Sequence, residues 1–107
     1  MSGVLLVVTT LPDRATAERI AAALVTARVA ACVNVLAECT SVYRWQGKIE
    51  RAGEVPMLIK TTRAAYAQLE ETLRTLHPYA VPEIVALPVT AGLPAYLDWV
   101  AQETKEN

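Results

Sequence analysis

Residues 41–62 read SVYRWQGKIERAGEVPMLIKTT, and this stretch decides the fold. β-Branched, aromatic and other apolar residues dominate residues 41–45 and 55–61, a composition that predicts the two strands of a hairpin. The connection between them, residues 46–54, carries two glycines among charged side chains. We therefore expect an exposed hairpin whose tip projects beyond the body of the domain.

Apolar runs flank this hairpin in the sequence. Residues 4–9 are rich in β-branched side chains, as expected of a short buried strand, and residues 29–36 are apolar on both faces. Residues 83–89 form the last predicted strand and contain Pro88. Because a proline inside a strand is tolerated at a sheet edge or a bulge, we expect this strand to lie at an edge or to contain a bulge.

Three helices are predicted between and after the strands. Asp13 and Thr62 are suitable N-caps, and apolar residues follow each of them at helical spacing. His77 and Pro78 end the second helix, and Pro94 begins the third. The expected order β-α-β-β-α-β-α is α+β. Its first six elements form the ferredoxin-like βαββαβ antiparallel sheet, and an additional C-terminal helix follows.

The composition predicts an assembly. A chain of 107 residues fits one domain over residues 1–107, and 53% of its residues are apolar, an excess for a small domain with much surface. Helices cover only one face of a ferredoxin-like sheet. Strands that are apolar on both faces therefore need a second cover, which we expect from other subunits, and free sheet edges favour strand addition between them.

Charge and hydropathy exclude two kinds of partner. The formal net charge is −1, from 10 basic and 11 acidic residues without a basic stripe, so we expect no nucleic acid. No run approaches the roughly 18 apolar residues of a membrane span. The apolar run at residues 4–8 has no positive segment before it and is shorter than a signal-peptide core. We therefore expect no membrane partner and a cytoplasmic protein.

Five segments carry a family resemblance: ARVAACVNV at 27–35, SVYRWQGKIE at 41–50, LIKTT at 58–62, HPYAVPEIVALPV at 77–89 and YLDW at 96–99. Together with the opening strand and helix, they resemble the CutA family of divalent-cation tolerance proteins over nearly the whole chain. The resemblance implies a ferredoxin-like fold, a tight homotrimer of PII-like architecture, and a link to tolerance of copper and other divalent cations. It implies no catalytic activity. We expect the trimer to resist heat, because folding and assembly bury surface together.

Metal ligands are few in this chain, which has one histidine and two cysteines. Copper favours thiolate and imidazole, and the hypothesis that follows is weak binding by His77, Glu83 and Cys39, with Cu²⁺ or another divalent cation as an optional ligand. We expect Cys32 to be buried in its strand and both thiols to be free. Thr9 stands where some relatives carry a cysteine. The simpler interpretation of His77 is a cap on the last helical carbonyls.

A second candidate set consists of aromatic and polar-tipped residues in the same segments: Tyr43, Trp45, Glu54, Lys60 and Tyr79. These residues either pack at a subunit interface or line an inter-subunit cleft that takes an anion or a small ligand. Lys60 is expected to pair with Glu54 or Glu83 across strands.

Three classes of function remain open. The chain is a metal-linked tolerance protein, a PII-like trimer that binds a small ligand in its inter-subunit clefts, or a structural trimer. An enzyme is not expected, because the sequence has no Gly-rich phosphate loop, no GxSxG and no paired-carboxylate motif.

Overall fold

The computed structural model describes residues 3–105. Within them the elements are, in order, β1 (Val4–Leu11), α1 (Arg14–Thr26), β2 (Cys32–Val35), β3 (Cys39–Trp45), β4 (Lys48–Thr62), α2 (Arg63–Leu76), β5 (Val85–Pro88) and α3 (Pro94–Glu103). The α+β class and the additional C-terminal helix are confirmed.

The sheet has the ferredoxin-like topology. Strands β2, β4, β1 and β5 lie side by side in that order, and each pairing is antiparallel. The units β1-α1-β2 and β4-α2-β5 are each a split βαβ, because a strand of the other unit is inserted between their two strands. Of the two expectations for the strand with Pro88, an edge or a bulge, the structure shows the edge.

The second strand is shorter than the predicted range of residues 29–36, because the first residues of that range belong to the end of α1. The amides of Val29 and Ala30 both donate to the carbonyl of Leu24, so these residues complete the end of α1. Only Cys32–Val35 remains for β2. The backbone leaves strand geometry at residues 36–38 and resumes it as β3, which contains the strand predicted at residues 41–45. The order β-α-β-β-α-β-α counts four strands, whereas the predicted segments and the structure both have five.

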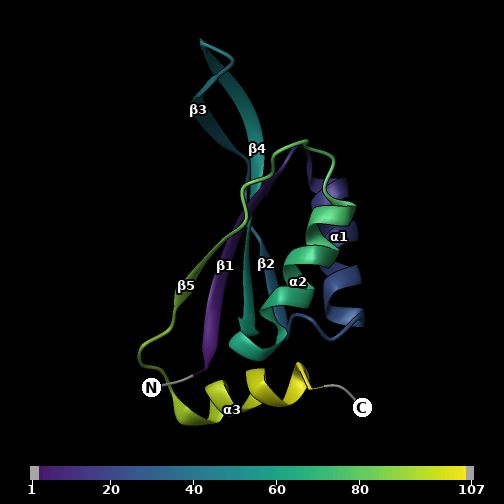
Figure 1. Ribbon diagram of the computed structural model, residues 1–107, viewed down its shortest axis with the longest axis vertical. Coiled ribbons are helices and arrows are strands. Elements are labelled where there is room, and N and C mark those ends of the chain that lie inside the picture. Colours follow the sequence, from purple (N-terminus) through teal and green to yellow (C-terminus); the bar gives the residue numbers. More distant parts are fainter. Residues whose placement is uncertain (1–2, 106–107) are drawn as a thin grey trace.

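The hairpin is longer than the sequence indicates. The connection shrinks from residues 46–54 to Gln46 and Gly47, and β4 begins at Lys48 and runs for 15 residues. Gln46 and Gly47 have φ of 50° and 80°, the left-handed pair of a two-residue turn whose twist matches that of paired strands. Strand β3 and the distal part of β4 form an arm, residues 39–54, that projects well beyond the rest of the molecule (Figure 1).

Both predicted N-caps are present. The Asp13 carboxylate accepts the amide of Thr16 at 2.7 Å, and the Thr62 hydroxyl accepts the amide of Ala65 at 3.2 Å. These caps begin α1 and α2, which cover the same face of the sheet (Figure 1). No helix of residues 3–105 is long and apolar enough to cross a membrane.

The core lies between these helices and that face. Alternate residues of β1 and β4, such as Val7 and Ile59, meet Leu24 of α1 and Leu69 and Leu73 of α2, all of them essentially inaccessible to solvent. Burial of each such side chain contributes about 1.5–3 kcal/mol. A smaller cluster joins α3 to the sheet, and it contains Val4, Ala31 and Val100.

The other face of the sheet is apolar and incompletely covered. Leu6 is the register partner of Leu87, and Val8 is the partner of both Leu58 and Val85, so these five side chains are neighbours. Val85 and Leu87 are 47% and 48% exposed, and the other three are half-buried. We call these five residues the open face.

Candidate functional site

A groove of about 910 Å³ lies at the base of the arm. Its walls come from the end of β1, from both strands of the arm and from the loop that follows α2. Four of the five residues in the predicted cleft line this groove: Tyr43, Trp45, Glu54 and Tyr79. Glu83 and Thr10 line it with them.

Glu54 is the central polar group of the groove. The residue is 8% exposed, and its Oε2 accepts hydrogen bonds from the Tyr79 hydroxyl at 2.8 Å and from Thr10 Oγ1 at 3.2 Å. Within residues 3–105, Oε1 has no hydrogen bond and the carboxylate has no Lys or Arg partner. The ion pair found in this range is Arg14–Glu18. Two hydroxyl groups therefore hold Oε2, and no cation of the described residues pairs with the carboxylate.

Tyr79 serves as a fixed hydrogen-bond donor to Glu54. Burial raises the pKa of its phenol far above the ordinary value, and the hydrogen bond to Glu54 and the negative charge there raise it further. The phenol thus keeps its proton across the physiological range. Its ring lies 4.8 Å, centroid to centroid, from the imidazole of His77.

His77 ties the loop after α2 to β1. Its Nδ1 accepts the backbone amide of Tyr79 at 3.2 Å. Nε2 therefore carries the proton of the neutral ring and donates to the carbonyl of Thr10 at 2.8 Å. Burial lowers the pKa of this imidazole, against smaller opposing effects from the Thr10 carbonyl and the charge of Glu54. The helix-end carbonyl of Leu73 is capped by the backbone amide of His77 and not by its ring.

The structure does not gather the predicted metal ligands. In the described part of the chain, no three His, Cys, Asp or Glu side chains lie close enough to hold a metal ion. Both ring nitrogens of His77 are engaged, whereas Cys39 and Glu83 are exposed, and Cys39 Sγ lies 3.8 Å from Ser41 Oγ. Metal binding by His77, Glu83 and Cys39 remains a prediction from the sequence.

Lys60 lies apart from the groove. Its register partners are Leu6 and Cys32, and its ammonium contacts the side-chain oxygen of Asn34. The expected pairing with Glu54 or Glu83 is wrong within one subunit. Six residues of extended strand separate Lys60 from Glu54, about 20 Å.

One further residue differs from its expected surroundings, and two threonines of β1 lie on opposite faces of the sheet. Cys32 is half-buried and not fully buried, because it lies on the incompletely covered side of the sheet. Thr9 points into the core, and its hydroxyl is buried without a hydrogen-bond partner in the described residues. Thr10 lines the groove, although its sequence context does not separate it from Thr9. Only the alternation of β1 assigns these two threonines to opposite faces.

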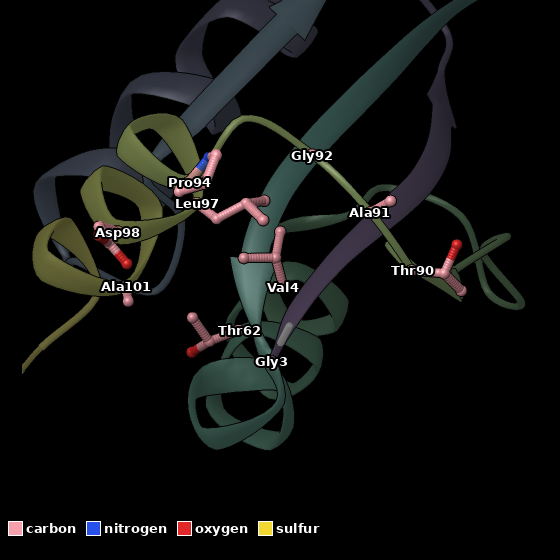
Figure 2. A pocket seen from close by; sticks show the side chains of 10 residues that line it. All are labelled: Gly3, Val4, Thr62, Thr90, Ala91, Gly92, Pro94, Leu97, Asp98 and Ala101. Atoms are coloured by element: carbon pink, nitrogen blue, oxygen red, sulfur yellow. The ribbon is translucent and has the colours of Figure 1, made fainter. Parts of the chain in front are cut away.

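A second hollow, about 450 Å³, lies between α3 and the start of β1. Figure 2 shows Leu97 of α3 and Val4 of β1 close together beside it, with Thr62 below and Asp98 further along the helix. Gly92 belongs to its rim, where a Cβ atom would come within 3.1 Å of Leu97 Cδ2. Its polar side chains are few: Thr90 and Asp98 are exposed, and the Thr62 hydroxyl already caps α2, so the groove at the arm is the stronger candidate site.

The split βαβ topology, the long arm and the groove at its base define a ferredoxin-like α+β protein with a projecting hairpin. Residues 5–103 match the family described as CutA1 divalent ion tolerance protein. The chain belongs to this family.

Relatives resemble the chain over most of its length. Divalent-cation tolerance protein CutA of Thermus thermophilus is 49% identical over 98 residues, which cover 92% of this chain and 95% of the relative. Protein CutA of Mus musculus is 49% identical over 96 residues, but these cover 90% of this chain and 54% of the mouse protein, so the chain spans about half of that relative.

Solved structures agree with the fold. The divalent cation tolerance protein of T. thermophilus is 47% identical and superposes with a TM-score of 0.93 over 95% of this chain and 99% of that chain. A more distant relative from Archaeoglobus fulgidus, named a periplasmic divalent cation tolerance protein, is 35% identical with a TM-score of 0.92, over 95% and 99% of the two chains.

Proposed function

We propose that the chain is a non-enzymatic protein of divalent-cation tolerance that works as a homotrimer. The observation that carries the proposal is the open face. Val85 and Leu87 are about half exposed beside three other apolar side chains, and a cover for them stabilises the sheet by the burial of apolar surface. Other copies of the same chain supply that cover.

The sheet edges support a closed ring. The edge strands, β2 and β5, differ in sequence and in neighbours. Pairing or packing that joins two unlike edges is heterologous, and a heterologous contact gives a finite assembly when it closes as a ring. We propose three subunits because the family resemblance implies a trimer.

Direct metal binding, in this proposal, is weak. Cys39 offers an exposed thiol and Glu83 an exposed carboxylate. His77 joins them only if its Nδ1 gives up the amide of Tyr79 or its Nε2 gives up the carbonyl of Thr10. Copper binding therefore competes with one of the two hydrogen bonds by which His77 holds the loop, which lowers the affinity.

Native mass spectrometry with added Cu²⁺ tests both parts, because it counts subunits and bound ions in one spectrum. We expect a trimer with copper that is lost on dilution, and a smaller copper occupancy in Cys39→Ser and His77→Ala than in the wild type. Tight copper binding that neither substitution weakens contradicts the ligand assignment, and a monomer at micromolar concentration contradicts the assembly.

A second function is favoured by the groove itself. Tyr43, Trp45, Glu54 and Tyr79 line one cavity at the base of an arm that a neighbouring subunit would flank. In this alternative the trimer resembles the PII signalling proteins and binds a small ligand in each inter-subunit cleft. A thermal-shift screen of metabolites separates the two, because a ligand that binds the folded state raises the melting temperature.

The cytoplasm is the proposed location. Cys32 and Cys39 are both free, and Cys39 is exposed, which suits a reducing compartment. The relative from A. fulgidus is named periplasmic, so the location needs its own test. Fractionation of the source cells, followed by an immunoblot, should find the protein in the cytoplasmic fraction, and recovery from the periplasmic fraction would refute this location.

A further inference from the structure

We infer that the groove at the base of the arm is a binding site for a cationic nitrogen group, an ammonium or a guanidinium, which pairs with Oε1 of Glu54. The inference concerns the ligand class of this groove and stands apart from metal tolerance.

The first observation is the state of Glu54. Only 8% of the residue is exposed, yet it lines the groove. Thr10 and Tyr79 both donate to Oε2, which leaves Oε1 without a hydrogen bond in residues 3–105. A buried carboxylate without a cation is costly, and pairing with a positively charged donor offsets that cost.

The second observation is the charge of the lining. Two carboxylates, Glu54 and Glu83, lie in the groove wall, and no Lys or Arg of the described chain joins them there. Lys60, which the sequence suggested as the partner, contacts Asn34 instead. The potential inside the groove is therefore negative, and it favours a cation over an anion or a neutral ligand.

The third observation is the aromatic wall. Tyr43 and Trp45 of β3 line the same groove and are 42% and 45% exposed. A ring face attracts an ammonium or a guanidinium, by about 0.5–2 kcal/mol according to desolvation. A hard divalent ion gains little from such rings and requires several oxygen ligands, whereas an organic cation needs one good carboxylate and an apolar wall.

The loop that completes the groove is held in place before any ligand arrives. Nε2 of His77 is bonded to β1, and Nδ1 of His77 is bonded to an amide of its own loop. The hydroxyl of Tyr79 is bonded to Glu54 of β4. Oε2 of Glu54 is thus fixed, and Oε1 is presented in one position. Such preorganisation lowers the ordering cost of binding.

The cation has two possible sources with the same chemistry: a free amine, or a Lys or Arg of a second copy that flanks the arm. The probe for the first is n-butylammonium chloride, with 1-butanol as its neutral analogue, titrated into uniformly labelled protein and followed by the Trp45 indole and Tyr79 amide resonances. Glu54→Gln keeps the shape and the acceptor for Tyr79, and Glu50→Gln of the same arm is the control outside the groove.

A free amine site predicts saturable shifts with butylammonium, none with butanol, at least tenfold weaker binding in Glu54→Gln and unchanged binding in Glu50→Gln. If a Lys or Arg of a second copy supplies the cation, the wild type should not bind the probe. The assembly of Glu54→Gln should then dissociate at a concentration at least tenfold higher than that of Glu50→Gln, as measured by sedimentation. Either result supports the inference.

The inference is overturned if Glu54→Gln binds the probe as the wild type does, or if it changes neither probe binding nor assembly. A folded spectrum of the variant is the requirement for each comparison. The outcome is separable from the proposed trimer, because a monomer that binds butylammonium through Glu54 retains the site and loses only the assembly.

Discussion

The hydroxyl of Thr9 is buried in the core without a hydrogen-bond partner in the described residues. An unsatisfied buried hydroxyl costs about 1–3 kcal/mol. Thr9→Val keeps the branched shape and removes the polar atom, so we expect the free energy of unfolding to rise by about 1 kcal/mol. Urea denaturation at fixed protein concentration measures the change.

Thr61→Val is the matched control for this experiment. Thr61 is equally buried, but its hydroxyl donates to the carbonyl of Val29 at 2.7 Å. Its replacement leaves that carbonyl without the bond, so this variant should be less stable by about 1 kcal/mol. Equal losses in both variants would show that the Thr9 hydroxyl has a partner in solution.

His77 makes stability depend on pH. Burial lowers the pKa of its ring in the folded chain below the ordinary value of 6.5, so the unfolded chain takes up the proton first as the pH falls. The contribution of His77 is therefore complete above about pH 6.5 and is lost as the pH drops towards the folded pKa. The free energy of unfolding should decrease from pH 7 to about pH 5, and His77→Gln should flatten this slope.

The same unfolding titration on Glu83→Gln is the control, since this residue is exposed and lies on the rim of the groove. Its slope over that pH window should match the wild type. A slope that His77→Gln leaves unchanged would assign the acid sensitivity to other groups.

Part of the site is predictable from residue chemistry alone. Tyr43, Trp45 and Tyr79 combine a large ring with a polar atom, a combination typical of interface and binding residues. The partner of Glu54 was not predictable. Thr10 and Lys60 are both polar residues on the incompletely covered side of the sheet. Only the register of β1 on β4 places Thr10 opposite Pro56, near Glu54, and Lys60 several residues away, opposite Leu6.

At the scale of elements, the turn of the arm is the most constrained position. Gly47 has a φ of 80°, and a Cβ there would meet no atom within 4 Å. Gly47→Ala thus introduces backbone strain alone, of about 1 kcal/mol. We expect faster hydrogen exchange in residues 42–51 with little change in the core strands.

Gly47→Asn is the companion variant, because asparagine adopts positive φ more readily than alanine. Its arm should exchange at a rate between those of the wild type and Gly47→Ala. If Gly47→Ala leaves exchange in the arm unaltered, the turn is not a left-handed pair in solution.

Elements were predictable where the signal is local. Asp13 and Thr62 identify the starts of α1 and α2 because a capping side chain and the apolar stripe behind it lie within one turn or two. The length of β4 is not a local property. Gln46 is an unusual residue for positive φ, and the charged residues after it pair with β3 through their backbone, so their side chains carry no strand signal.

At the scale of the whole molecule, assembly and folding should be coupled. If the open face is buried between subunits, unfolding releases three chains, and the melting temperature rises with protein concentration. We also expect it to exceed the roughly 45–65 °C of ordinary mesophile domains. Calorimetry over a hundredfold range of concentration checks both points, and a concentration-independent melt in the ordinary range would contradict them.

Light scattering coupled to size exclusion tests the central claim, the trimer formed through the open face. The wild type should have about three times the chain mass of 11.6 kDa at micromolar concentration. Leu58→Asp places a charge on the open face and should yield smaller species, whereas Val25→Asp on the exposed side of α1 should leave the trimer intact. A wild-type mass near 11.6 kDa would contradict the account.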